Sequence, residues 1–316
     1  MKDNRKKEHQ KELKEAIGKL KKEKNALIMA HYYQRDEIQE IADFVGDSLA
    51  LARQAAQTDA DIIVMCGVHF MGETAKILCP EKKVLIPEPK AGCSLADSCN
   101  PVEFKDFISH YPEHTVISYV NTSAAVKALT DIVVTSGNAR NIVEQLPKHE
   151  KIIFGPDRNL GEYINSVTGR KMVLWNGACH VHDRFSMEKI IEMKNAHPGA
   201  KILVHPECKR PLQLIADKVG STAALLEFAA SDDAREYIVV TESGILFEMR
   251  RKCPEKTFLA APAEDAECQC NECDYMKMNT LEKVYECLKN ESPEIKVDPS
   301  VARDAVKSIE RMLRMS

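Results

Sequence analysis

Three pairs of polar residues, spaced alike along the chain, carry groups suited to acid–base chemistry. In each pair the residues stand two positions apart and follow a short apolar segment: His31 and Tyr33, Tyr119 and Asn121, His205 and Glu207. Residues i and i+2 of an extended segment project to the same side, so each pair should present two side chains together. A satisfied residue at a strand end would explain any one pair alone. Three pairs of differing chemistry offer proton donors, acceptors and bases, and so indicate a reaction site.

A hydroxyl residue stands seventeen positions after the first member of each pair, at Ser48, Ser136 and Thr222. Serine and threonine at strand-to-helix junctions are common helix N-caps, which explains each of them singly. Helix N-termini also attract anions, so three such positions around one cavity would suit substrates with carboxylates and phosphate. The glycine-rich fingerprints of dinucleotide and P-loop sites are missing, which disfavours nucleotide binding.

Eleven cysteines raise the question of a metal centre. Cys268, Cys270 and Cys273 are close together, but the second paired knuckle of a zinc ribbon is missing. The last predicted strand of each repeat also leads into a cysteine, which gives Cys93, Cys179 and one of those three. Three thiolates can hold a cubane cluster whose fourth iron is open and acts as a Lewis acid. The alternatives are a local zinc or redox site at residues 268–273, or small buried thiols at Cys93 and Cys179.

An internal repeat organises these residues. Three segments align without a gap from Ala30, Ser118 and Val204, so that the pairs and the hydroxyls recur together. Each segment has an apolar strand, apolar positions at helical spacing such as Ile38, Ile41 and Val45, and then an aspartate (Asp43, Asp131 and Asp217). Further helix and strand patterns follow in alternation. This rhythm predicts an α/β protein with three αβα domains of nearly ninety residues, each with a short parallel sheet.

We expect the domains to span residues 1–95, 96–181 and 182–275, followed by a helical tail at 276–316. Ligands bind beyond the carboxyl ends of parallel strands, so the three pairs would line one cavity around a pseudo-threefold axis. Residues 1–24 hold ten Lys and Arg against five Asp and Glu. Leu13, Ile17 and Leu20 give this segment one apolar edge, so we interpret it as a solvated surface helix. A nucleic-acid or membrane partner is not expected.

The composition describes a globular protein: 44% of the 316 residues are hydrophobic, 29% are charged, and the net charge is −4. We find neither a signal peptide nor a run long enough to span a membrane. A cytoplasmic location is therefore expected, where cysteines are more often thiols or metal ligands than disulfides.

Ten motifs, in order along residues 26–290, resemble the bacterial and archaeal quinolinate synthase family. They are AHYYQ…EIADFVGDSLALAR, FMGETAKILCP, AGCSLADSC, YVNTSAAVKA, GPDRNLG, CHVHDRF, HPEC, GSTAALL, TESG and CDYMKMNTLEK. The resemblance implies three pseudo-threefold-related αβα domains with the active site at their common interface. It also implies condensation of iminosuccinate with dihydroxyacetone phosphate to quinolinate, with release of phosphate and two waters, for NAD synthesis. An aspartate oxidase or dehydrogenase is the implied source of iminosuccinate.

The resemblance implies that an oxygen-sensitive [4Fe-4S] cluster is held by Cys93, Cys179 and Cys273, with one iron left open. Spacing from the preceding strand would favour Cys268, so the resemblance replaces that choice by Cys273. Cys268 and Cys270 are then bystanders or a redox pair.

The resemblance also implies the substrate contacts. The residues expected to bind iminosuccinate or its reaction partners are His31, Ser48, Tyr119, Asn121, Ser136, His205, Glu207 and Thr222, with Tyr33 and His182 close by. We expect Glu207 and Tyr33 to transfer protons with help from His31, and Asn121 and His205 to orient the substrate. Two other functions remain open: an open-iron hydro-lyase acting on a small polycarboxylate, and a non-enzymatic zinc or redox module.

Overall fold

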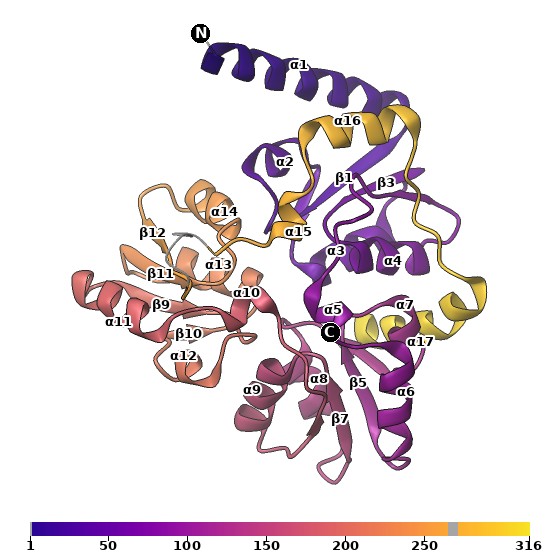
Figure 1. Ribbon diagram of the computed structural model, residues 1–316, viewed down its shortest axis with the longest axis vertical. Helices are drawn as coiled ribbons and strands as arrows, with labels where there is room; N and C mark the ends of the chain where they lie inside the picture. The colour runs from indigo at the N-terminus through magenta and orange to yellow at the C-terminus, as the bar shows by residue number, and fades with distance from the viewer. Residues whose placement is uncertain (1, 265–270) are drawn as a thin grey trace. The chain divides into compact units, whose positions relative to one another are not determined.

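The computed structural model describes residues 2–264 and 271–316 (Figure 1). The chain divides into two compact units, and each is taken by itself below. The first consists of Met1–Cys93 with Asp274–Ala302, and the second of Ser94–Cys273 with Arg303–Ser316. The domain boundaries expected from the repeat stay a prediction.

Each of the three repeats forms a parallel four-stranded sheet. The first unit contains one sheet, in the order β2-β1-β3-β4, and the second unit contains two, in the orders β6-β5-β7-β8 and β10-β9-β11-β12. The strands are β1 (Ala26–His31), β2 (Phe44–Gly46), β3 (Ile62–Cys66), β4 (Lys83–Leu85), β5 (Thr115–Tyr119), β6 (Ile132–Val134), β7 (Ile152–Gly155), β8 (Val173–Leu174), β9 (Lys201–Val204), β10 (Lys218–Val219), β11 (Glu236–Val240) and β12 (Thr257–Ala260). The predicted α/β class and the threefold repetition of short parallel sheets are confirmed.

Helices alternate with these strands. In the first unit they are α1 (Lys2–Glu23), α2 (Asp36–Ile41), α3 (Ser48–Gln57), α4 (His69–Leu78), α15 (Asp274–Lys277) and α16 (Leu281–Asn290). In the second unit they are α5 (Ser94–Asp97), α6 (Pro101–Ser109), α7 (Ala124–Lys127), α8 (Ala139–Gln145), α9 (Arg158–Thr168), α10 (His180–Asp183), α11 (Met187–Ala196), α12 (Arg210–Leu214), α13 (Thr222–Ser231) and α14 (Ile245–Lys252). Helix α17 (Pro299–Met315) lies mostly in the second unit. Among the described residues, none of the helices combines the length and apolar character needed to cross a membrane.

One local prediction is wrong in all three repeats. The apolar spacing after each pair predicted a single helix, but the last apolar position lies in a short strand, β2, β6 or β10. Those positions are Val45, Val133 and Val219. Val45, for example, is paired with Ala30 of β1. Strands of two or three residues are too short to show an alternating pattern, so the helical period of the preceding residues extended over them.

The aspartate that recurs in the repeat has a structural role. In each repeat its carboxylate accepts the backbone N–H of a residue on the first strand, and its own N–H donates to the carbonyl of that same residue. The carboxylate bonds are Asp43 to Ile28 (2.9 Å), Asp131 to Val116 (2.8 Å) and Asp217 to Ile202 (2.7 Å), and the reverse bonds complete each pair. These contacts tie the start of the short second strand to the first strand, away from the polar pairs.

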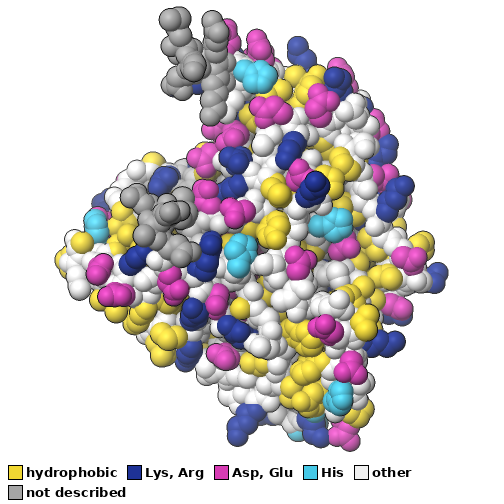
Figure 2. Space-filling model, viewed as in Figure 1, with side chains coloured by type: hydrophobic (Ala, Val, Ile, Leu, Met, Phe, Trp, Pro, Cys, Tyr) yellow, Lys and Arg dark blue, Asp and Glu magenta, His cyan; other side chains and the backbone are white. Residues whose placement is uncertain are grey.

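The basic helix α1 packs on the core of the first unit. Leu13 and Ile17 are buried with Leu281 and Val284 of α16. On its polar side, Lys21 forms an ion pair of 2.6 Å with Asp43. Figure 2 shows Lys and Arg side chains lying among Asp and Glu side chains on one face of the molecule. The positive charge of this segment is therefore partly balanced by acidic neighbours within its own unit.

Candidate active site

The polar pairs lie in tight turns at the carboxyl ends of the first strands. The N–H of Tyr33 donates to His31 Nδ1 at 3.1 Å, and the N–H of Glu207 donates to His205 Nδ1 at 3.3 Å. The chain therefore turns after each histidine, and the extended backbone assumed from the sequence is wrong for these two pairs. The members still lie together, since the His31 and Tyr33 ring centroids are 4.5 Å apart.

Three buried donors that the sequence analysis missed hold these turns. They occupy equivalent repeat positions on α2, α7 and α12: Gln39, Lys127 and Gln213. Gln39 Nε2 donates to the carbonyls of Tyr32 and Gln34, and Gln213 Nε2 donates to those of Pro206 and Cys208. Lys127 Nζ donates to the carbonyl of Thr122. These donors could have been predicted from the sequence, because a polar residue recurs at the same position of an otherwise apolar helix face in all three repeats.

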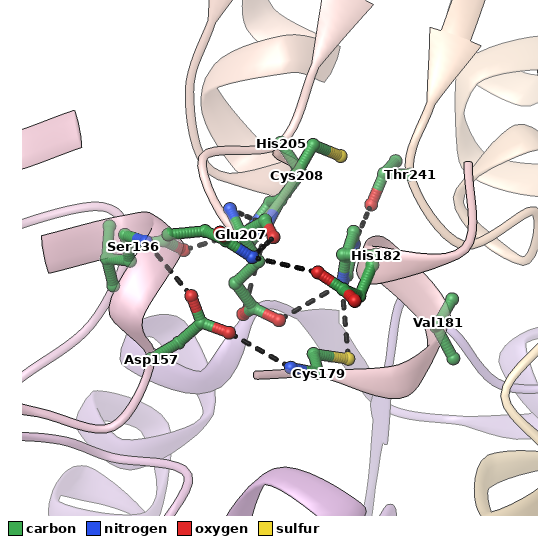
Figure 3. A network of polar contacts seen from close by, with 12 residues as sticks. Ser136, Asp157, Cys179, Val181, His182, His205, Glu207, Cys208 and Thr241 are labelled. Atoms are coloured by element: carbon green, nitrogen blue, oxygen red, sulfur yellow. Dashed lines mark hydrogen bonds and ion pairs between the residues drawn. The ribbon is translucent and has the colours of Figure 1, made fainter. Parts of the chain in front are cut away.

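Glu207 is the centre of a buried polar network in the second unit (Figure 3). Its Oε1 accepts the hydroxyl of Tyr119 at 2.5 Å, and its Oε2 lies 3.0 Å from His182 Nδ1. His205 Nδ1 lies 3.8 Å from Oε1, and the His182 and His205 rings stack at 4.6 Å. Asn159 Nδ2 donates to the Glu207 carbonyl at 3.0 Å. The structure thus joins residues of the second and third repeats around one carboxylate.

The charge of this carboxylate follows from its neighbours. Burial raises the pKa of Glu207, but the positive charges of His182 and His205 and the hydrogen bonds from His182 and Tyr119 outweigh it and lower this pKa to about 2. Burial, and then the charge of Glu207, raise the pKa of Asp157, although backbone N–H groups favour its ionised form. The network therefore keeps Glu207 anionic beside the stacked rings of His182 and His205.

Hydroxyl groups orient both imidazoles. Ser136 Oγ lies 3.2 Å from His205 Nε2, and Thr241 Oγ1 lies 2.9 Å from His182 Nε2. The structure thus brings Ser136, His182 and His205 to Glu207. Thr241 was not among the expected site residues, and only its place at the end of a predicted strand could have pointed to it.

The N-cap interpretation of the repeated hydroxyls is wrong. Helix α3 is capped by Asp47, whose side chain accepts the N–H of Ala50, and α13 is capped by Ser221, which accepts the N–H of Ala224. Ser48 and Thr222 are instead the first residues of these helices. Ser136 lies three residues before α8. Because Asp47 and Ser221 cap these helices one position earlier, the hydroxyls of Ser48 and Thr222 do not serve as caps.

The other expected site residues are not among the neighbours of Glu207 described above. Asn121 Oδ1 is buried and has no hydrogen-bond partner among the residues that the structure describes. Thr222 is buried at the start of α13. His31, Tyr33 and Ser48 belong to the first unit, which is described separately from the network around Glu207.

Cys179 lies at the edge of this network. Its Sγ is 3.3 Å from His182 Nδ1. The sulfur of Cys179, a ring nitrogen of His182 and a carboxylate oxygen of Glu207 all lie within 4.8 Å of one another, so this group could hold a metal ion. Sulfur, nitrogen and oxygen donors of this kind suit borderline transition metals.

Backbone hydrogen bonds identify equivalent cysteines in the three repeats. In each repeat, a residue just after the third strand donates its N–H to the carbonyl two positions before a cysteine. The bonds are His69 to Ala91 (2.8 Å, before Cys93), Arg158 to Gly177 (2.8 Å, before Cys179) and Ser243 to Asn271 (3.3 Å, before Cys273). Each of these cysteines also directly precedes a four-residue helix, α5, α10 or α15. Within its own repeat, Cys273 therefore occupies the position that Cys93 and Cys179 occupy in theirs.

A family model described as Quinolinate synthetase A protein matches residues 15–314. The chain belongs to the quinolinate synthase family. Proteins named quinolinate synthase are similar to it along nearly their whole length. That of Chloroherpeton thalassium is 54% identical over 305 residues, which cover 96% of this chain and 95% of the relative. That of Microcystis aeruginosa is 55% identical over 301 residues, with 95% and 94% covered.

The iron–sulfur cluster expected from the sequence resemblance would need cysteine ligands. Metal ligation needs a thiolate, which burial disfavours. Burial raises the pKa values of five described thiols, in two cases to about 12: Cys66, Cys79, Cys208, Cys99 (about 12) and Cys287 (about 12). Cys93, Cys179 and Cys273 are only half-buried. These three fit the cluster's requirement better than the buried thiols. Cys268 and Cys270 lie outside the described residues, so their expected role as bystanders or a redox pair stays a prediction.

Proposed function

We propose that this member of the quinolinate synthase family condenses iminosuccinate with dihydroxyacetone phosphate to quinolinate, releasing one phosphate and two waters. The observation that carries the proposal is the buried network in which Glu207 meets Tyr119, His182 and His205 beside the sulfur of Cys179. The reaction joins two small anions and then eliminates water. It therefore requires positive or hydrogen-bonding groups for the anions and several groups that move protons.

Anion binding is assigned to the hydroxyls Ser48, Ser136 and Thr222. Ser48 and Thr222 are the first residues of the ten-residue helices α3 and α13. The N-termini of such helices favour negative charge. Carboxylate and phosphate oxygens of the substrates are the proposed ligands of these positions.

Proton transfer is assigned to Tyr33, Glu207, His31 and His205. Two donors, Tyr119 and His182, already contact the Glu207 carboxylate. We propose that Glu207 holds these two groups in place and accepts a substrate proton through them. We propose that His205 Nε2, which lies beside Ser136 Oγ, donates a proton to the leaving hydroxyl. Asn121, with its buried amide oxygen, is proposed to orient the substrate.

The proposed cofactor is a [4Fe-4S] cluster held by Cys93, Cys179 and Cys273. When bound, its open iron supplies a Lewis acid that makes hydroxyl a better leaving group. The equivalent backbone bonds before the three cysteines support this ligand set. A further bond agrees with it, because Ser94 Oγ lies 2.5 Å from His180 Nδ1, and these two residues directly follow Cys93 and Cys179.

The proposed place of the reaction is de novo NAD synthesis in the cytoplasm. Iminosuccinate is unstable in water, so an aspartate oxidase or dehydrogenase is the proposed partner that supplies it.

The test is anaerobic turnover of the reconstituted protein with dihydroxyacetone phosphate and iminosuccinate, the latter generated in the assay from oxaloacetate and ammonia. We expect quinolinate and phosphate in equal amounts. Dehydration of a polycarboxylate without any need for dihydroxyacetone phosphate would instead establish the hydro-lyase. A metal content of one zinc and no sulfide, with no turnover, would establish the zinc or redox module.

A further inference from the structure

Two buried carboxylates hold the backbones of Cys179 and Cys273. Asp157 Oδ2 accepts the N–H of Cys179 at 3.0 Å, as Figure 3 shows. Glu242 Oε1 accepts the N–H of Cys273 at 3.1 Å. Both carboxylate side chains are fully buried.

The second oxygen of each carboxylate holds the start of a helix. Asp157 Oδ1 accepts the N–H of Leu160 at 3.0 Å, at the beginning of α9. Glu242 Oε2 accepts the N–H of Gly244 at 2.7 Å, directly before α14. Each carboxylate therefore bridges a long helix and the cysteine that begins a short one.

The two carboxylates occupy equivalent places in their repeats. Ser118 of β5 is paired with Gly155, and Val204 of β9 is paired with Val240. Ser118 and Val204 directly precede Tyr119 and His205, the first members of the polar pairs. Asp157 and Glu242 both stand two residues beyond the paired strand residue. An aspartate and a longer glutamate thus perform the same task in two different repeats.

Asn271 links the two cysteine segments. Its Nδ2 donates to the carbonyl of Val181, which lies in the short helix begun by Cys179. Its own carbonyl accepts the N–H of Ser243. The chain of contacts from Asp157 through Cys179, α10 and Asn271 to Cys273 and Glu242 is therefore continuous.

Burial of a carboxylate destabilises the folded protein unless hydrogen bonds satisfy its oxygens. In Asp157 and Glu242, one of the two oxygens is satisfied by the N–H of a cysteine. We propose that Asp157 and Glu242 are positioning residues that fix Cys179 and Cys273 as ligands. This inference rests on the cluster proposed above. Mutation of a residue that orients a metal ligand without touching the metal commonly weakens metal binding by about tenfold or more.

The test compares Asp157→Asn and Glu242→Gln with wild type. Each variant keeps the size and shape of the side chain but replaces one accepting oxygen by an NH2 group, which cannot accept a hydrogen bond from one of the two N–H donors. The matched control is Asp217→Asn, which alters a carboxylate that accepts the N–H of Ile202 at the amino end of β9. After anaerobic reconstitution, iron release to a chelator is followed at constant pH, together with the far-ultraviolet circular dichroism spectrum. We expect about tenfold faster release in both variants and wild-type release in Asp217→Asn.

A second readout needs no cluster. In the metal-free chain, alkylation of each cysteine by iodoacetamide is timed by peptide mapping. We expect Asp157→Asn to change the rate at Cys179 and Glu242→Gln to change it at Cys273, each by at least about threefold and each with little effect on the other cysteine. If one variant does not fold, the other decides alone. Unchanged iron release and unchanged alkylation in folded variants would overturn the inference, whereas a wild-type protein that assembles no cluster but keeps the alkylation pattern would overturn only the cofactor proposal.

Discussion

Tyr119 donates its hydroxyl to Glu207 across 2.5 Å, and this hydrogen bond joins the second repeat to the third. Tyr119 ends strand β5, and Glu207 lies in the turn after β9. The bond therefore connects the corresponding ends of two parallel sheets, which is where open α/β sheets bind ligands. The Tyr119 hydroxyl can also be removed by substitution without changing the charge of the proposed site.

Tyr119→Phe removes this bond and keeps the ring. Hydrogen bonds to charged groups contribute about 1.5–3 kcal/mol, so we expect kcat/KM for quinolinate formation to fall roughly tenfold to a hundredfold, with normal iron content. The matched control is Tyr237→Phe, which removes another tyrosine–carboxylate bond, from Tyr237 to Asp232 (2.9 Å). That variant should lose stability and keep its kcat/KM. Equal losses of kcat/KM in both variants would contradict the role of Tyr119.

Lys127 provides a test of the turn-holding position. The side chain is fully buried and donates to the Thr122 carbonyl, as Gln39 and Gln213 do to their own turns. We expect Lys127→Ala to lower the free energy of unfolding by about 2–4 kcal/mol, through the lost bond and the cavity. Lys127→Gln should cost clearly less, because glutamine serves the two equivalent positions. Urea denaturation measures both, with the exposed Lys105→Ala as control. A glutamine variant as unstable as the alanine variant would show that the positions are not equivalent.

Substitution of Gly18 and Gly169 by alanine should test the effect of backbone conformation on stability without any effect of steric crowding. A Cβ added at Gly18 or at Gly169 would meet nothing within 4 Å. Gly18 lies inside helix α1, so Gly18→Ala should raise stability by about 0.5–1 kcal/mol. Gly169 ends α9 with φ at +70°, so Gly169→Ala should lower stability by about 1–2 kcal/mol. Thermal unfolding of the two variants should therefore shift in opposite directions, and a shift of the same sign in both would contradict this account.

Acid sensitivity of the third repeat should depend on Asp232. The hydrogen bond from Lys201 is the main cause that lowers the pKa of Asp232 to about 2, against the opposing effect of burial. A carboxyl whose pKa is lower in the folded chain stabilises it above the unfolded pKa of about 4, and this contribution is lost as the pH falls from about 4 to 2. Asp232→Asn should therefore lower the Tm of the metal-free chain at pH 7 and narrow its difference from wild type near pH 3. A difference that stays constant over this range would exclude this role.

The repeat made much of the architecture predictable. Polar pairs, aspartates and hydroxyls recur at constant spacing because three sheets with one strand order need the same turns. The short strands β2, β6 and β10 escaped prediction because two or three residues carry no readable period. Their aspartates were found, but only the bonds of Asp43 and its equivalents to the first strand showed that they are structural.

The surroundings of the site were less predictable, for a geometric reason. Asp157 and Glu242 are 85 residues apart, whereas Tyr119 and His205 are 86 apart, so a gap-free alignment places a serine opposite Asp157. Only strand pairing shows the equivalence. Spacing favoured Cys268 over Cys273 because Cys273 lies 32 residues after Thr241, whereas Cys93 and Cys179 lie 26 and 24 residues after Gly67 and Gly155. His182 reaches Glu207 from a separate short helix, a contact that a repeat pattern cannot encode.

We propose that a cluster held by one cysteine of each repeat supports quinolinate synthesis. Iron, sulfide and quinolinate formation should be measured on the same anaerobically reconstituted samples of Cys273→Ala, Cys268→Ala and Cys270→Ala. Cys273→Ala should lose the cluster and the activity, whereas the other two should keep about four irons per chain and near-normal turnover. A Cys273→Ala protein with a full cluster and normal quinolinate formation would contradict the claim.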